Sequence, residues 1–161
     1  MRSLTKYKYA GDGNSLLEWP KHAHPLKVLR NIIAIEIAKY MPLGLKNKLY
    51  RAIGIKVGKN VSVAYKVTFD ILFPELIEIG DNTIIGYGCT ILAHEFLIKE
   101  LRIGKVKIGK NVMVGANSTV LAGVTIGDNA TVSAMSLVNE NVPENAFAGG
   151  IPVKVLRKTS T

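Results

Sequence analysis

Residues 108–142 read IGKNVMVGANSTVLAGVTIGDNATVSAMSLVNENV, and this stretch decides the fold. An aliphatic residue returns at every sixth position, and a small or β-branched residue follows each one four places later. Neither an α-helix nor an amphipathic strand produces a period of six. The aliphatic positions are Ile108, Val114, Val120, Ile126, Val132 and Val138, and the positions four places later hold Val112, Ser118, Val124, Ala130, Ser136 and Val142.

The same frame extends toward the N-terminus in two shorter runs, broken at Ile71–Glu78 and at Phe96–Lys107. A coil with three flat faces explains the period, because each face takes six residues and directs one aliphatic side chain inward. Gly, Asn and Asp recur between the repeats and suit tight turns, since they tolerate positive φ. The earlier inward positions are Val57, Val63, Phe69, Ile79, Ile85 and Ile91, with Thr83 and Cys89 at the small position.

This pattern resembles the hexapeptide-repeat superfamily of left-handed parallel β-helices over about residues 57–157. The resemblance implies a mainly β fold, with a β-helix domain at 57–157. It leaves residues 1–56 as a basic lead segment with a short helical part, and residues 158–161 as a flexible tail. Disorder is expected only at the two polar ends, 1–15 and 158–161.

The lead segment predicts helices that cover one open end of the coil stack. Leu26, Leu29, Ile33, Ile37 and Tyr40 recur at helical spacing and predict the packed face. The polar residues Lys27, Arg30, Asn31 and Lys39 lie opposite, and a second short helix is expected through Leu45, Leu49 and Ile53. Peripheral contact of these helices with a membrane surface is the alternative interpretation.

The net charge of +9 belongs entirely to the first third of the chain. Residues 1–59 hold 12 Lys/Arg and 3 Asp/Glu, whereas the remaining residues hold 9 of each. Such a segment can steer anionic partners, rest on an acidic membrane, or simply be a solvated helical surface. Nucleic-acid binding is set aside, because the cations are not interleaved with stacking aromatics and no recognised module is present.

The sequence indicates a cytoplasmic protein, possible membrane association aside. Its single cysteine, Cys89, allows no intrachain disulfide and no Cys-rich zinc site, and is expected to be inert. The start lacks the features of a signal peptide. The most apolar stretch, Ile32–Met41, is far shorter than a bilayer span and carries charges.

His94, in the stretch TILAHEF (90–96), follows an inward aliphatic just before the second interruption. A lone histidine is usually an ordinary surface residue. Here its placement resembles the acetyltransferase branch that contains the maltose, galactoside and xenobiotic O-acetyltransferases, in which the catalytic histidine immediately precedes an excursion loop. The resemblance implies that His94 is the general base, taking a proton from an acceptor hydroxyl (or amine) that attacks the thioester of acetyl-CoA.

The same resemblance assigns Asp70 to the acceptor site, because related enzymes carry an aspartate near this point. Glu95, next to the histidine, is assigned to the acceptor site as well. The alternative for Asp70 is a turn residue. The stretch from Asp70 to Ile79 departs from the family pattern, since it is longer than in those relatives.

The run GGIPVKVLRK (149–158) resembles the end of the acetyltransferase coil. The resemblance implies that Lys154 and Arg157 meet the phosphates of coenzyme A, for which cationic donors are suited; a solvated tail is the alternative. It also implies a pantetheine groove between two subunits, and therefore a homotrimer. The matching groove residues are Gly115, Ala116, Ser133, Ala134 and Asn139; the next position holds Glu140, whose charge does not suit a neighbouring phosphate.

Two other functions share this fold. A γ-type carbonic anhydrase needs three histidines that converge on one zinc ion, and His22 and His24 lie in the lead segment outside the repeat, so no metal is expected. A non-catalytic scaffold is the other alternative, and His94 together with the C-terminal run argues against it. The resemblance thus implies an acetyl-CoA-dependent O-acetyltransferase whose acceptor is a sugar or sugar derivative.

Overall fold

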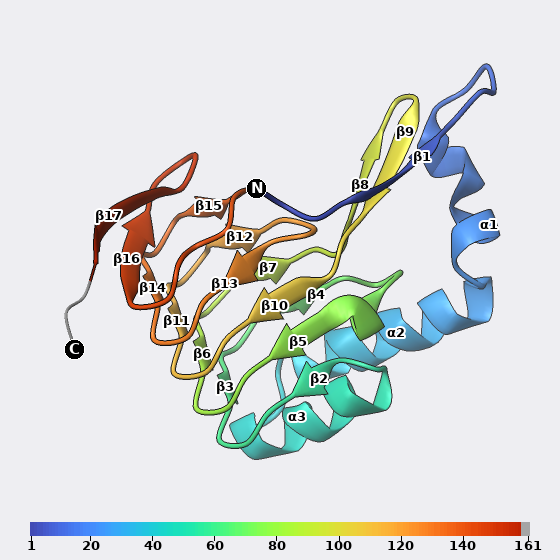
Figure 1. Ribbon diagram of the computed structural model, residues 1–161. Coiled ribbons are helices and arrows are strands. Elements are labelled where there is room, and N and C mark those ends of the chain that lie inside the picture. Colours follow the sequence, from blue (N-terminus) through green and yellow to red (C-terminus); the bar gives the residue numbers. More distant parts are fainter. Residues whose placement is uncertain (159–161) are drawn as a thin grey trace.

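A computed structural model describes residues 1–158 and consists mainly of short strands stacked in coils (Figure 1). Successive strands along the chain belong to three different parallel sheets, which form the three faces of a left-handed β-helix. The predicted fold class is confirmed. Face one holds β2 (Lys56–Val57), β5 (Ile77–Ile79), β10 (Val106–Ile108) and β13 (Thr125–Ile126); face two holds β3 (Ser62–Val63), β6 (Ile84–Ile85), β11 (Met113–Val114), β14 (Thr131–Val132) and β16 (Ala146–Gly149); face three holds β4 (Thr68–Phe69), β7 (Thr90–Ile91), β12 (Thr119–Val120) and β15 (Leu137–Val138).

We number the coils from the N-terminal end of the stack. Coil 1 contains β2–β4, coil 2 contains β5–β7, coil 3 contains β10–β12, coil 4 contains β13–β15, and the partial coil 5 ends in β16. The last strand, β17 (Lys154–Lys158), folds back antiparallel on β16. The β-helix therefore begins at Lys56 and its final strand reaches Lys158, one residue beyond the predicted boundary at each end, and residues 159–161 of the predicted tail lie outside the described chain.

The inward aliphatics from Val63 to Val138 form one continuous column in which each side chain is at most 1% exposed. Val57, in the first strand, is only partly buried. Fully burying a side chain of this kind contributes roughly 1.5–3 kcal/mol. The six-residue pattern therefore identified the core residue by residue.

Asparagine ladders close the first corner, between faces one and two. Asn60, Asn82, Asn111, Asn129 and Asn145 all have φ between 54° and 59°. Their side-chain amides donate along the stack, from Asn82 to Asn111 at 2.9 Å, from Asn111 to Asn129 at 3.0 Å and from Asn129 to Asn145 at 3.1 Å. Asparagine tolerates this left-handed conformation because its short polar side chain can bond locally.

Two excursions leave the stack at the third corner, between faces three and one. The first, between β4 and β5, contains the short helix η2 (Pro74–Leu76). The second contains the hairpin of β8 (His94–Leu97) and β9 (Glu100–Ile103), which projects from the body in Figure 1 and which we call the arm. Both coincide with the predicted interruptions of the repeat.

The first residues of the chain brace this arm. β1 (Thr5–Lys8) pairs antiparallel with β9 and turns the hairpin into a three-stranded sheet. The prediction of disorder for residues 1–15 is therefore wrong for the strand. The polar composition predicted disorder because β1 is an exposed edge strand. It is held by main-chain hydrogen bonds and not by a buried apolar face.

The helices η1 (Ser15–Glu18), α1 (Trp19–His22), α2 (Pro25–Ala38) and α3 (Leu43–Ala52) follow. Residues of α2 and α3 belong to the same core cluster as the first coil, so these helices cover the N-terminal end of the stack as predicted. The predicted packed face of α2 is wrong, however. Its buried residues are Val28, Asn31, Ile35 and Ala38, whereas Leu26, Leu29, Ile33, Ile37 and Tyr40 are 52–70% exposed.

The helix is apolar on two faces, and the pattern alone did not decide which one meets the coil. The decisive contact is polar, because Asn31 Nδ2 donates to the Ile71 carbonyl at 2.8 Å and must lie on the packed side. No helix in the described chain is long and apolar enough to cross a bilayer.

Candidate active site

His94 and Asp70 meet at the third corner, where the two excursions begin. His94 Nδ1 lies 2.5 Å from Asp70 Oδ2. The imidazole stands between two phenylalanine rings, Phe73 at 5.8 Å and Phe96 at 5.2 Å between centroids, and its side chain is 16% exposed. The ring is therefore fixed on three sides and open on the remaining one.

Asp70 is buried and acts as an acceptor for the surrounding main chain. Its Oδ1 accepts hydrogen bonds from the N–H groups of Leu72 and Phe73 at 2.8 and 2.9 Å. Its Oδ2 accepts from those of Ala93 and His94 at 2.7 and 3.1 Å. Asp70 thus ties both excursions together beneath the imidazole.

Burial alone would raise the pKa of Asp70, but the hydrogen bond and charge of His94, together with the N–H groups of Phe73 and Ala93, hold that pKa below its ordinary value. The carboxylate is therefore ionised at neutral pH and can only accept. The proton between the two side chains belongs to His94 Nδ1, which leaves the lone pair of Nε2 available as a base. This tautomer follows from the hydrogen-bond network.

The contact of Asp70 with the acceptor stays a prediction. In the structure its side chain is 0% exposed, and its close partners are the His94 imidazole and four main-chain N–H groups. No pattern in the sequence pointed to the pairing with His94, since the two residues are 24 positions apart.

Glu95 points away from His94, because neighbouring residues of a strand face opposite sides. Its Oε1 accepts from Arg2 Nη1 at 2.8 Å, and Arg2 also donates to the Ala122 carbonyl at 3.2 Å. Glu95 Oε2 is buried and has no hydrogen-bond partner within the described chain. The structure therefore joins Glu95 to the N-terminal brace of the arm and not to the imidazole.

Four of the predicted cofactor residues lie together at the second corner, between faces two and three. Gly115 and Ala116 form that corner in coil 3, and Ser133 and Ala134 form it in coil 4. A Cβ at Gly115 would collide with the backbone of Ala134, so only glycine lets the coils stack at this point. The resulting corner is narrow and carries small side chains.

The remaining cofactor residues occupy two other places. Lys154 and Arg157 are exposed on β17, where Lys154 pairs with Gly149, and a Cβ on that glycine would strike Ser133. Lys154 therefore lies at the C-terminal end of the second corner, whereas Arg157 pairs with Phe147 on face two and its guanidinium lies 5.0 Å from the centre of that ring. Asn139 follows β15 at the third corner, the corner that also carries His94, with its Oδ1 buried and unpartnered in the described residues.

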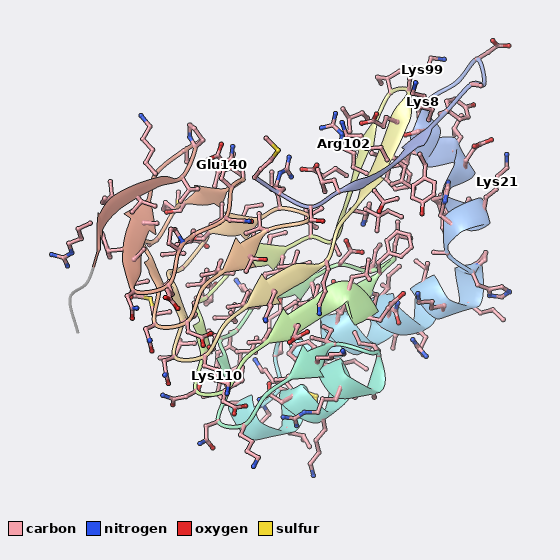
Figure 2. The ribbon with its side chains drawn as sticks, viewed as in Figure 1. Lys8, Lys21, Lys99, Arg102, Lys110 and Glu140 are labelled. Carbon is pink, nitrogen blue, oxygen red and sulfur yellow. The ribbon has the colours of Figure 1, made fainter. Side chains whose placement is uncertain are left out.

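Within one chain, His94 and the predicted groove are on different corners. About five residues of extended chain separate them, which corresponds to roughly 16 Å at ~3.3 Å per residue. A hollow of about 860 Å³ lies on the arm and includes Phe96 but neither His94 nor the second corner. Figure 2 shows Lys8 and Lys99, which line that hollow, toward the far end of the arm, and Arg102 nearer its base.

The other polar groups considered from the sequence do not join this site. His24 Nδ1 accepts from the N–H of Leu26 at 3.3 Å and caps α2, and His22 packs against Tyr7. In residues 1–158 no three His, Cys, Asp or Glu side chains are grouped as metal ligands. Burial raises the pKa of the Cys89 thiol, which lies 3.1 Å from the Gly115 carbonyl, in line with the prediction of an inert side chain.

Comparisons with known proteins agree with this architecture. The model of the hexapeptide repeat of succinyl-transferase matches residues 105–135. YvoF of Bacillus subtilis (strain 168), a candidate acetyltransferase, is 52% identical over 158 residues, which cover 97% of this chain and 91% of that protein. Galactoside O-acetyltransferase of Escherichia coli (strain K12) is 30% identical over 159 residues, covering 91% and 77%.

The chain belongs to the hexapeptide-repeat acetyltransferase superfamily. Among solved structures, its fold is similar to a galactoside acetyltransferase in complex with coenzyme A, with a TM-score of 0.63, 22% identity and coverage of 84% and 82% of the two chains. It is also similar to a maltose O-acetyltransferase from Clostridium difficile 630, with a TM-score of 0.67, 21% identity and coverage of 85% and 90%. The predicted superfamily is confirmed.

Proposed function

We propose that this protein transfers an acetyl group from acetyl-CoA to a hydroxyl (or amine) of an acceptor, a sugar or sugar derivative, with His94 as the general base. The observation that carries the proposal is the 2.5 Å contact between His94 Nδ1 and the buried Asp70 carboxylate. It fixes the tautomer in which Nε2 can accept a proton. The superfamily, and the relative named as a galactoside O-acetyltransferase, support the reaction class.

The transfer needs no covalent enzyme intermediate. His94 Nε2 takes the proton of the acceptor hydroxyl as its oxygen attacks the thioester carbon, and the new C–O bond forms. The tetrahedral intermediate then collapses, the C–S bond breaks, and the proton held by His94 passes to the leaving sulfur to give the thiol of coenzyme A. Such a base contributes a factor of about 10² to 10⁴, and Asp70 stabilises the imidazolium while it exists.

We further propose that the working unit is a homotrimer. The corner that carries His94 and Asn139 is roughly 16 Å from the corner that carries the cofactor groove in the same chain. A cleft between two copies unites the third corner of one with the second corner of its neighbour. Cyclic symmetry then generates three equal sites, each incomplete in one chain alone.

Small side chains at the second corner suit the pantetheine arm of acetyl-CoA, and the cations Lys154 and Arg157 at the C-terminal end of the stack suit its phosphates. Glu140, near Met1 and Arg2 at the third corner, is the one nearby acid that does not suit a phosphate. Arg2 and Lys6 line the same hollow as Glu140.

A membrane-surface contact of the lead segment stays a prediction. It rests on the exposed apolar side of α2 and on the excess of cations in residues 1–59. Sedimentation with vesicles of anionic and of neutral lipid tests it: binding to the anionic vesicles alone is expected, and recovery of all the protein in both supernatants contradicts it.

The activity is tested by mixing the protein with acetyl-CoA and a panel of saccharides and following thiol release. His94→Ala is expected to lower kcat by about 10² to 10⁴ while acetyl-CoA binding stays nearly unchanged. Unchanged turnover in His94→Ala overturns the proposal, and acetyl-CoA binding without transfer to any acceptor favours the alternative of a scaffold.

A further inference from the structure

A column of aromatic side chains continues the second corner beyond the proposed cofactor groove. The N–H of Gly88 donates to the Tyr65 carbonyl at 3.1 Å, and the N–H of Asn117 donates to the Tyr87 carbonyl at 2.8 Å. The N–H of Met135 donates to the Ala116 carbonyl at 2.9 Å. Tyr65, Tyr87, Ala116 and Ala134 therefore occupy the same place in coils 1, 2, 3 and 4. Neighbouring coils are about 4.8 Å apart, so the two tyrosines stand next to the small residues in one line.

Two lysines accompany the tyrosines. Lys46 Nζ lies 4.6 Å from the centre of the Tyr65 ring, and Lys66 Nζ lies 5.5 Å from that of Tyr87. Among the residues that the structure describes, neither ammonium forms an ion pair with a carboxylate. Tyr65 and Tyr87 are 48% and 45% exposed. The end of this corner thus presents two flat aromatic rings and the ammonium of Lys66, whereas the side chain of Lys46 is fully buried and donates to the Ala64 carbonyl at 3.2 Å.

The position of this cluster along the coil stack can be compared with that of His94, the proposed base. The inference rests on the proposed function, in which copies form a closed ring. If the symmetry axis runs along the coil stack, a rotation moves a residue around the axis but not along it. His94 leaves the stack directly after β7 of coil 2. In a neighbouring copy, the second-corner residue of coil 2 is Tyr87.

The direction of the cofactor follows from the same column. Lys154 and Arg157 mark its phosphate end beyond coil 4, and Ala134 and Ala116 follow in coils 4 and 3. The thioester then reaches the height of His94 at coils 2 and 3. The only part of the corner that remains on the far side of the thioester is the segment of coils 1 and 2 that carries Tyr65, Lys66 and Tyr87.

We propose that Tyr65, Lys66 and Tyr87 form the acceptor subsite and that they select an anionic saccharide. The apolar face of a sugar ring packs on the tyrosine rings, and the ammonium of Lys66 attracts a phosphate or carboxylate on that sugar. The hydroxyl to be acetylated then faces the thioester and His94 of the adjacent copy.

The experiment compares one saccharide in three forms. N-acetylglucosamine, N-acetylglucosamine 1-phosphate and UDP-N-acetylglucosamine are titrated into the protein by calorimetry, and each is assayed for thiol release with acetyl-CoA. Saturable binding of at least one charged form, at least tenfold tighter than the neutral one, is expected. The relative affinity of the phosphate and the nucleotide-linked form identifies the source of the charge. Equal or absent binding of the charged forms overturns the inference.

The variant Lys66→Asn removes the cation and keeps the backbone, because Lys66 has φ 59° and asparagine tolerates that conformation. Lys110→Asn, on the first corner, removes the same charge elsewhere. Lys66→Asn is expected to weaken binding of the charged form at least tenfold, with the neutral sugar and acetyl-CoA unaffected, whereas Lys110→Asn has no effect. Equal effects of the two variants contradict the inference.

Tyr87→Ala is expected to weaken both the neutral and the charged forms, since it removes the stacking surface. The failure of the proposed function is recognised separately, by thiol release that His94→Ala leaves unchanged. If the inference fails, turnover still depends on His94, but substitutions of Tyr65, Lys66 and Tyr87 do not change it.

Discussion

Asp70 Oδ2 and His94 Nδ1 lie 2.5 Å apart, and the same carboxylate accepts four main-chain hydrogen bonds. One group therefore holds both the loop after β4 and the start of the arm. The Asp70 carboxylate therefore affects both the backbone of the site and the protonation of His94, the proposed base. Two kinds of variant separate these two effects.

Asp70→Asn keeps the shape of the side chain but removes its charge. An amide stabilises the imidazolium less, and its NH₂ group can favour the wrong tautomer of His94. We expect kcat to fall by about 10- to 10³-fold with little change in the KM for acetyl-CoA. Steady-state kinetics with both substrates varied provides the measurement; a change confined to KM contradicts the positioning role.

Asp70→Ala also removes the acceptor of four buried N–H groups. Each N–H group left without an acceptor lowers the free energy of unfolding by about 1–3 kcal/mol, and by less where water accepts its hydrogen bond. Urea unfolding should therefore show a loss of several kcal/mol, larger than that of Asp70→Asn. Equal stability of the two variants would mean that the loop finds other partners.

Stability should also depend on pH through Asp70. Its pKa is lowered in the folded protein, so its ionised form stabilises the fold above the ordinary aspartate pKa of about 3.9, and this contribution is lost as the pH falls through the lower folded value. We expect the urea midpoint of the wild type to decrease over this acidic range. Asp70→Asn should lack that component. Parallel midpoint curves for the two proteins would show that the pKa of Asp70 is not shifted.

The ion pair of Arg2 and Glu95 provides a test of whether the N-terminal residues stabilise the arm. Their ion pair of 2.8 Å has side chains that are 18% and 19% exposed, and it ties the chain start to the residue after His94. Arg2→Ala leaves the Glu95 carboxylate without its partner, so we expect a lower kcat and an arm that exchanges amide hydrogens faster. A double-mutant cycle with Glu95→Ala should give a coupling energy of about 0.5–3 kcal/mol. Additive effects would show that the pair does not hold the arm.

The repeat predicted the coil, its core and both excursions, because a period of six allows one inward residue on each face. It could not predict contacts that depend on tertiary placement. Asp70 and His94 meet only because two excursions leave the same corner in successive coils. The polar composition of β1 did not indicate a strand, because β1 is stabilised by main-chain pairing with β9. The exposed side of α2 was misassigned, because both sides of that helix are apolar and a single buried amide, Asn31, decides between them.

The shared cleft can be tested by mixing two inactive chains. His94→Ala removes the base at the third corner, and Ala116→Trp fills the cofactor groove at the second corner. Each homotrimer should be inactive. In a mixed trimer, a cleft formed by the third corner of an Ala116→Trp chain and the second corner of a His94→Ala chain contains both intact halves.

Coexpression with two affinity tags isolates the mixed trimers. In each isolated mixed trimer, one cleft in about three combines the intact base of one variant with the intact groove of the other. The activity of the isolated mixed trimers should therefore return to about a third of the wild-type value. Mixed trimers that bind acetyl-CoA but stay inactive would mean that base and groove act within one chain, in spite of the roughly 16 Å between their corners.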